Sequence, residues 1–210
     1  MLRSFCRVVL CTCVLATGCG GGDARDEGAD PARSDVGTSE APSQAATDGT
    51  QGADLNIAFA SPCDAVDSSA LEEVLGGPAD ETDTWKPGDK EPSINFTYED
   101  YGCAYSTTPV DSGTGASISV ASSDNDRFAT ARAGAGQVRG ANTCEEEAGV
   151  FGEQSFRNRC TDGKRVTFQD VALAGPSVFS CIVQGGEDQQ TRLEDQATEF
   201  CTAVAEALSR

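Results

Sequence analysis

From residue 58 to the C-terminus, apolar and polar residues alternate with the periods of helices and strands. The clearest helical period ends the chain, where these apolar residues recur at three- and four-residue spacing: Leu193, Ala197, Phe200, Val204 and Leu208. Such spacing places them on one face of a helix, which we expect to pack against the core. A shorter helix is predicted between Ser69 and Gly76. Ser69 and Glu72 fit a capping box, and Gly76 followed by Pro78 is typical of a helix end.

Five runs between these helices have the pattern of strands: 94–98, 101–105, 117–120, 165–169 and 177–183. The runs at 94–98 and 117–120 alternate apolar and polar side chains, as a sheet with one solvent-facing side requires. The run at 177–183 is apolar on both faces, which predicts a central strand. Residues 124–132 predict a middle helix. The order of these elements predicts an α+β fold, with an antiparallel sheet and flanking helices.

The start of the chain has a different composition. An apolar run at 8–16 follows two arginines and is too short to span a bilayer, which needs roughly 20 apolar residues. This arrangement predicts a secretory signal. The sequence Leu15-Ala16-Thr17-Gly18-Cys19 resembles the lipobox of bacterial lipoproteins, although Ala16 stands where the lipobox usually has leucine. The resemblance implies cleavage after Gly18 and lipid attachment at Cys19; an ordinary signal peptide with a chance cysteine is the alternative.

Residues 20–54 contain neither leucine nor phenylalanine and are rich in Gly, Ala, Ser, Thr and Asp. Such a segment cannot bury enough apolar surface to offset the entropy of ordering, so we expect it to be disordered. We therefore divide the chain into a signal peptide at 1–18, a disordered tether at 19–57 and a single extracytoplasmic domain at 58–210.

The chain is strongly acidic, with 34 Asp and Glu against 15 Lys and Arg, and its net charge is −19. Such a surface repels phosphate backbones and anionic lipid heads. We therefore expect no nucleic-acid partner, and membrane contact only through the lipid on Cys19. The charge indicates solubility in a crowded envelope or, alternatively, recognition of a cationic partner or a metal. Histidine is absent from the sequence, which excludes Ser-His-Asp and Cys-His catalysis, so we expect no enzyme activity and no cofactor.

Six cysteines lie outside the signal and Cys19: Cys63, Cys103, Cys144, Cys160, Cys181 and Cys201. An even number in an exported chain predicts disulfides. A zinc site is the alternative, but the chain has neither a CxxC motif nor histidine. We expect the bridges Cys63–Cys103, Cys144–Cys160 and Cys181–Cys201, because short loops are the easiest to close.

Several short motifs of the folded domain resemble a family of actinobacterial cell-envelope lipoproteins of unknown function. The similarity lies in Pro62-Cys63, Gly102-Cys103-Ala104-Tyr105, the turn at 149–153 before Phe156, and Glu199-Phe200-Cys201. The resemblance spans most of the domain and implies export, a lipid anchor, paired cysteines and an α+β fold. The family has no established activity to carry over, and Cys144 and Cys160 lie outside its pattern.

Four groups of side chains are candidates for a site. Asp124-Asn125-Asp126 can supply oxygen ligands to Ca²⁺, but a helix N-cap is the alternative because the EF-hand glycine and glutamate are missing. Glu145-Glu146-Glu147 is predicted to be a solvated loop or a helix start, and Glu99-Asp100 to line a turn. The three aromatic residues Trp85, Tyr98 and Tyr105 either line a binding groove or pack in the core.

Together these observations predict a lipid-anchored lipoprotein on the outer face of the cell membrane, acting as a non-catalytic binding or sensing module. Its partner is expected to be a small molecule or an envelope protein. The alternative is a structural accessory protein of an envelope complex. An apolar groove between sheet and helices would favour binding, whereas a flat acidic face without a cavity would favour the accessory protein.

Overall fold

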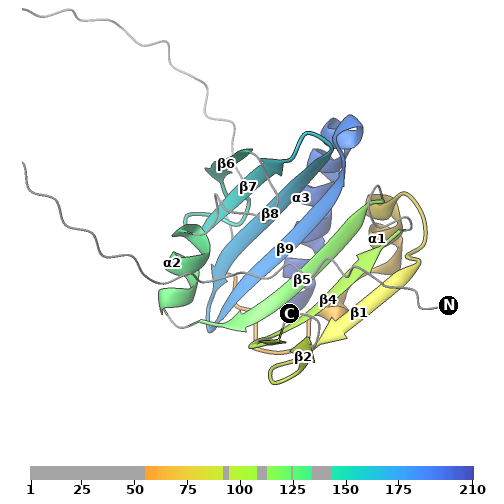
Figure 1. The fold of residues 1–210 in the computed structure, drawn as a ribbon. Coiled ribbons are helices and arrows are strands. Elements are labelled where there is room, and N and C mark those ends of the chain that lie inside the picture. The colour runs from red at the N-terminus through yellow and green to blue at the C-terminus, as the bar shows by residue number, and fades with distance from the viewer. Residues whose placement is uncertain (1–54, 92–94, 108–112, 124, 134–142) are drawn as a thin grey trace, which may run out of the picture.

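The computed structural model describes residues 55–210, except 92–94, 108–112, 124 and 134–142. A seven-stranded sheet dominates this part of the chain (Figure 1). Its strands run, in spatial order, β1 (Glu81–Trp85), β4 (Asp100–Ser106), β5 (Gly115–Ser122), β9 (Ser177–Gly186), β8 (Arg165–Ala174), β7 (Ser155–Thr161) and β6 (Thr143–Ala148). Every neighbouring pair of these strands is antiparallel, which confirms the predicted α+β class. A separate hairpin joins β2 (Lys90–Glu91) to β3 (Phe96–Thr97).

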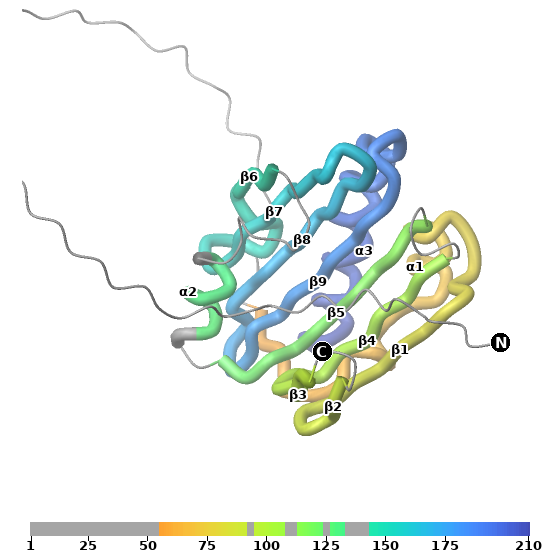
Figure 2. The backbone as a smooth tube through the Cα atoms, viewed as in Figure 1, coloured from red at the N-terminus to blue at the C-terminus, as the bar shows by residue number. Residues whose placement is uncertain are grey.

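One face of the sheet is covered by α1 (Ser68–Leu75) and α3 (Gln190–Leu208), which lie side by side (Figures 1 and 2). Two short 3-10 helices, η1 (Cys63–Ala65) and η3 (Glu187–Gln189), precede them. The predicted stripe of the final helix is confirmed, because Leu193, Ala197, Phe200 and Val204 are all buried. These side chains meet the inward residues of the central strands in a continuous apolar core: Ile118, Val120, Phe168, Phe179 and Val183.

The other face of the sheet carries α2 (Asn125–Ala133) at one end (Figure 1). Phe128 of this helix packs on Phe156 of β7, with ring centroids 5.5 Å apart. Val171 and Val178 complete this second, smaller core. The predicted middle helix is therefore present, although residue 124 lies outside the described residues.

The first helix begins at a different residue from the predicted one. Its N-cap is Asp67 rather than Ser69, and the Asp67 carboxylate accepts hydrogen bonds from the backbone N–H groups of Ser69 and Ala70, both at 3.0 Å. A carboxylate satisfies these donors and also favours the positive end of the helix dipole, so Asp67 outcompetes the serine two positions later. The predicted end is confirmed: Gly76 has φ +76°, a left-handed conformation that glycine adopts readily.

The central strands were predictable, whereas the edge strands were not. β4, β5, β8 and β9 contain the predicted runs, and β9 is the middle strand of the sheet. The run at 94–98 contributes only the two residues of β3. Glu145–Glu147 were expected in a loop or helix start, but they lie in the edge strand β6. The sequence pattern also predicted no strand at β1 or β7.

Two of the three expected disulfides are confirmed. Cys144–Cys160 joins β6 to β7, and Cys181–Cys201 joins β9 to α3. The expected Cys63–Cys103 bridge is wrong for this structure, in which both residues are free thiols. The two are nevertheless neighbours, and the Cys63 thiol donates to the backbone carbonyl of Gly102, 3.4 Å away, instead of bonding to Cys103.

The predicted signal peptide, Cys19 and most of the tether lie outside the described residues. Within the described ranges, none of the helices combines the length and the apolar character required to cross a membrane. The same part of the chain contains no group of three or more Asp, Glu or Cys side chains arranged to hold a metal ion.

Candidate binding groove between α1 and α3

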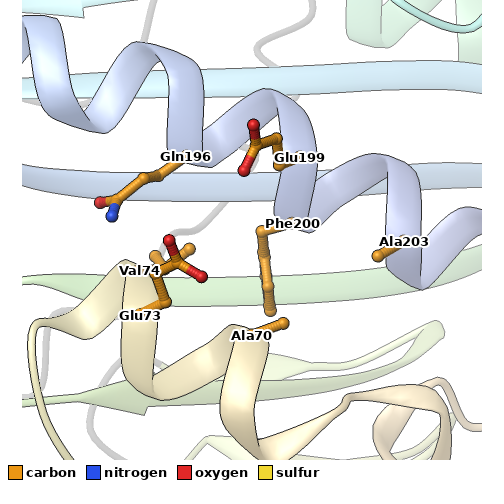
Figure 3. A pocket seen from close by; sticks show the side chains of 7 residues that line it. All are labelled: Ala70, Glu73, Val74, Gln196, Glu199, Phe200 and Ala203. Carbon is orange, nitrogen blue, oxygen red and sulfur yellow. The ribbon is translucent and has the colours of Figure 1, made fainter.

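A groove separates the two helices that cover the sheet. It encloses about 160 Å³ and is lined by seven residues from α1 and α3: Ala70, Glu73, Val74, Gln196, Glu199, Phe200 and Ala203 (Figure 3). We call this feature the α1–α3 groove. Its lining residues follow helical spacing on each element, so each helix contributes a single face.

The floor of the groove is apolar and rigid. Phe200 and Val74 are each only 2% exposed and belong to the main core. Above them, Ala70 and Ala203 occupy positions where a larger side chain would fill the space between the helices (Figure 3). The groove lies between two helices rather than between the sheet and the helices.

The rim of the groove is polar and mostly acidic. Glu73 and Glu199 reach it from opposite helices and are both exposed (Figure 3). Gln196 accepts a hydrogen bond from Nη1 of Arg192, and the same nitrogen lies 3.5 Å from the carbonyl oxygen of Glu73. Arg192 therefore sits at one end of the groove and connects its two walls.

The helical layer around the groove has an excess of negative charge. Along α1 and α3, carboxylates are carried by Glu72, Glu73, Glu194, Asp195, Glu199 and Glu206, whereas Arg192 is the only basic residue of these two helices. At the rim of an apolar slot, such a field attracts cations and repels anions.

The aromatic residues singled out in the sequence do not lie together, because Trp85 and Tyr105 lie on different faces of the sheet. Trp85 stacks on Tyr98 with ring centroids 5.2 Å apart, and its other side lies against Gly102, where an added Cβ would come within 2.2 Å of the ring. The indole is half-buried between these contacts. Tyr105 is three residues beyond Gly102 in β4 and consequently points to the opposite face, beside the Cys103 thiol. The predicted core packing is confirmed for Tyr105, which lies against the main core, whereas Trp85 and Tyr98 stack on each other and are half-buried.

The carboxylates predicted to line a turn are engaged separately. Asp100 accepts a hydrogen bond from the Trp85 indole at 3.1 Å, and its burial raises the pKa of the carboxyl group. Glu99 pairs instead with Arg127. Each carboxylate is thus engaged in a contact within the fold, and the charge of Arg127 also acts on Asp100. The side chains of the Asp124–Asp126 candidate lie outside those the structure describes.

The three glutamates of β6 are likewise occupied by ion pairs. Glu145 and Glu147 both pair with Arg159 of the neighbouring strand, and Glu146 pairs with Arg132 of α2 at 2.8 Å. These ion pairs connect the edge strand β6 to β7 and α2, so we assign them a structural role. Pairs of this kind, exposed on the surface, contribute about 0–1 kcal/mol each.

Sequence reasoning missed one buried ionic contact. Arg157 donates two hydrogen bonds to Asp170, at 2.8 and 2.6 Å, and a third to the hydroxyl of Thr198 at 2.8 Å. Both charged side chains are almost fully buried between the sheet and α3. A polar residue inside a strand gives no sign of such burial, because the partner lies far away along the chain.

Comparisons with known proteins add no relative to this picture. No family model matches the chain, and no curated protein matches its sequence. The functional conclusion therefore depends on the geometry and charge of the α1–α3 groove together with the features of the sequence.

Proposed function

We propose that this protein is a lipid-anchored lipoprotein of the cell envelope that acts as a non-catalytic binding module for another envelope protein. The observation that carries the proposal is the α1–α3 groove, with its buried apolar floor and its two opposed carboxylates. A volume of about 160 Å³ is below the about 300–1,000 Å³ of typical small-molecule sites. The groove is therefore sized for a side chain that projects from a larger partner.

The proposed anchor follows from the sequence Leu15–Cys19 and the apolar run before it. Acyl chains on Cys19 would hold the protein on the outer face of the cell membrane, since each buried CH₂ contributes about 0.8 kcal/mol. With a flexible tether of this length, the r.m.s. reach from the anchor is about 35 Å. The groove could then meet partners at the membrane or some distance above it.

We also propose that this protein is not an enzyme. The sequence contains no histidine, and Glu73 and Glu199 are exposed at the rim of the groove. The groove can recognise a group through charge and shape, but it offers no activated nucleophile beside a base.

A structural accessory protein of an envelope complex is the second candidate. The acidic layer of α1 and α3 favours it, because a broad charged face can steady a complex without inserting any side chain into a groove. The two candidates differ in where the partner touches the helices.

Site-specific photo-crosslinking in the producing cell tests this function. A crosslinking amino acid is placed at Ala203 in the groove, at Glu206 on the same helix outside it, and at Lys164 in the exposed β7–β8 turn as the control. We expect one discrete protein adduct from Ala203 and none from Lys164. Equal adducts from Ala203 and Glu206 would support the accessory protein instead, and no adduct from either helix position would contradict both candidates.

The anchor has its own test. Replacing Cys19 with serine removes the sulfur that lipidation needs, so the protein should move from the membrane fraction to the soluble fraction. Mass spectrometry of the wild-type N-terminus should find acyl groups on Cys19. An unmodified N-terminus at another residue would contradict the anchor but leave the groove unaffected.

A further inference from the structure

The α1–α3 groove combines two properties that few side chains can satisfy together. Its floor is formed by the buried Phe200 and Val74, and its rim carries Glu73 and Glu199 on opposite walls. A ligand that fills it must place an apolar stem on the floor and a cationic head between the carboxylates. We propose, building on the binding function above, that the groove receives one lysine or arginine side chain of the partner protein.

The size of the groove agrees with a single long side chain. A volume of about 160 Å³ is well above the roughly 10–15 Å³ that one water needs and below that of a drug-sized site. A lysine or arginine stem fits such a slot lengthwise, and these residues commonly bury the stem while keeping the charged head in water. The head then lies at the rim, where Glu73 and Glu199 are exposed.

The charge decides between a cationic and a purely apolar occupant. A leucine or methionine would cover the carboxylates of Glu73 and Glu199 without pairing them, and removing water from an unpaired charge is costly. An acidic side chain would meet six carboxylates on these two helices against the single guanidinium of Arg192. Only a cationic head both fills the slot and pairs with its rim.

The chain already places one guanidinium at the end of the groove. Nη1 of Arg192 donates to Gln196 and lies 3.5 Å from the Glu73 carbonyl oxygen. This contact shows that the acceptors around that end suit a guanidinium. Glu199 and Ala203 lie further along α3, which leaves their end of the groove for the partner's side chain.

Nuclear magnetic resonance on the full chain, held in non-ionic detergent, tests this inference. The probes are N-acetyl-lysine methylamide and N-acetyl-norleucine methylamide, which share the same stem but differ in the cationic head. We expect the lysine probe to shift the methyl signals of Ala70, Val74 and Ala203, and the norleucine probe to shift them far less. Exposed ion pairs of this kind predict that each carboxylate removed weakens binding about two- to five-fold.

Two double variants with the same change in charge provide the comparison. Glu73→Gln/Glu199→Gln removes the rim carboxylates, whereas Glu72→Gln/Glu206→Gln removes two acids of the same helices that do not line the groove. All four side chains are exposed, so both variants should fold. We expect only the first variant to lose the response to lysine; equal losses in both would show general attraction by the acidic layer and overturn the inference.

The cationic specificity of the groove and the binding function proposed above can fail independently in these experiments. A norleucine probe that binds as well as lysine overturns the cationic specificity. If Ala203 still crosslinks to a discrete protein in that case, the binding function stands without it. Failure of both the crosslink and the lysine probe removes both proposals.

Discussion

The hydrogen bond between Asp100 and Trp85 can be followed by tryptophan fluorescence, because Trp85 is the only tryptophan of the chain. The indole N–H donates to the Asp100 carboxylate at 3.1 Å at the end of β4. Burial raises the pKa of Asp100, and hydrogen bonds from Trp85 and Ser119 with the charge of Arg127 oppose that rise only in part. The folded protein therefore binds this proton more readily than the unfolded chain does.

We predict that the fluorescence of Trp85 titrates with a midpoint above about 3.9, the ordinary aspartate pKa. Because the folded pKa is the higher one, the contribution of Asp100 to stability is fully present below the unfolded pKa and is lost as the pH rises through the folded pKa. Asp100→Asn should remove the fluorescence transition while the protein stays folded. A transition that persists in this variant would assign the titration to another group.

The free thiols give a second prediction for single residues. Cys103 is fully buried, and this burial, together with the neighbouring Cys63 thiol, raises the pKa of its thiol. Because the thiolate is the reactive form, Cys103 should resist alkylation in the native protein, whereas the half-buried Cys63 should react first. Peptide mapping after iodoacetamide treatment, before and after denaturation without reductant, measures this order. A Cys63–Cys103 peptide pair found joined would instead restore the three-bridge pattern.

At the level of elements, the predicted central strands have one or both faces in the core, whereas the buried strand β7 was missed because its sequence is mostly polar. Residues 117–120 alternate because Ile118 and Val120 face the main core under the helical layer while Ser117 and Ser119 face away. The edge strand β1 is exposed at nearly every position, so it has no apolar period to recognise. Strand β6 is also exposed at nearly every position, and its run of glutamates has the composition of a loop. Acidic side chains on both edges also discourage pairing with another sheet.

The α1–α3 groove could not be predicted from the sequence, for a different reason. Helical spacing correctly predicted that Phe200 faces the core. It did not show that α1 lies beside α3, which depends on how both helices pack on the sheet. That Ala70 and Ala203 line a groove becomes clear only once the packing of α1 beside α3 is known. For the same reason the Arg157–Asp170 pair, which connects β7 and β8 and also reaches Thr198 in α3, had no signal in the sequence.

The two disulfides differ in what they connect, and this difference yields a prediction for the elements. Their sequence separations of 16 and 20 residues are similar, so the loop-entropy model gives about 3 kcal/mol for each. Cys181 and Cys201 are both fully buried between β9 and α3, whereas in the other bridge Cys160 is buried but Cys144 is only half-buried, in an edge strand that already pairs with its neighbour. Replacing Cys181 and Cys201 by alanine leaves space in the core as well.

We therefore expect Cys181→Ala/Cys201→Ala to lower the free energy of unfolding by about 3–5 kcal/mol. The pair Cys144→Ala/Cys160→Ala should lower it by about 2–3 kcal/mol. Urea unfolding without reductant measures both. Equal losses would mean that loop closure in the unfolded chain accounts for each bridge and that the packing of Cys181 and Cys201 adds nothing.

At the level of the whole molecule, the net charge of −19 opposes the compact state. Repulsion between exposed acids acts over a Debye length of about 30 Å in 0.01 M salt but only about 8 Å in 0.15 M salt. Ion pairs such as Arg127–Glu99 and Arg159–Glu145 weaken with salt as well, yet exposed pairs are worth only about 0–1 kcal/mol each. The long-range repulsion should therefore decide the sign of the salt effect.

We predict that raising sodium chloride from about 0.01 to about 0.15 M increases the urea midpoint of unfolding without changing the slope of the transition. Asp195→Asn/Glu206→Gln, which removes two exposed charges from α3, should raise the low-salt midpoint and flatten its dependence on salt. A midpoint that falls on adding salt would show that the local ion pairs outweigh the repulsion. The repulsion between exposed acids would then be too weak to decide the stability of the fold.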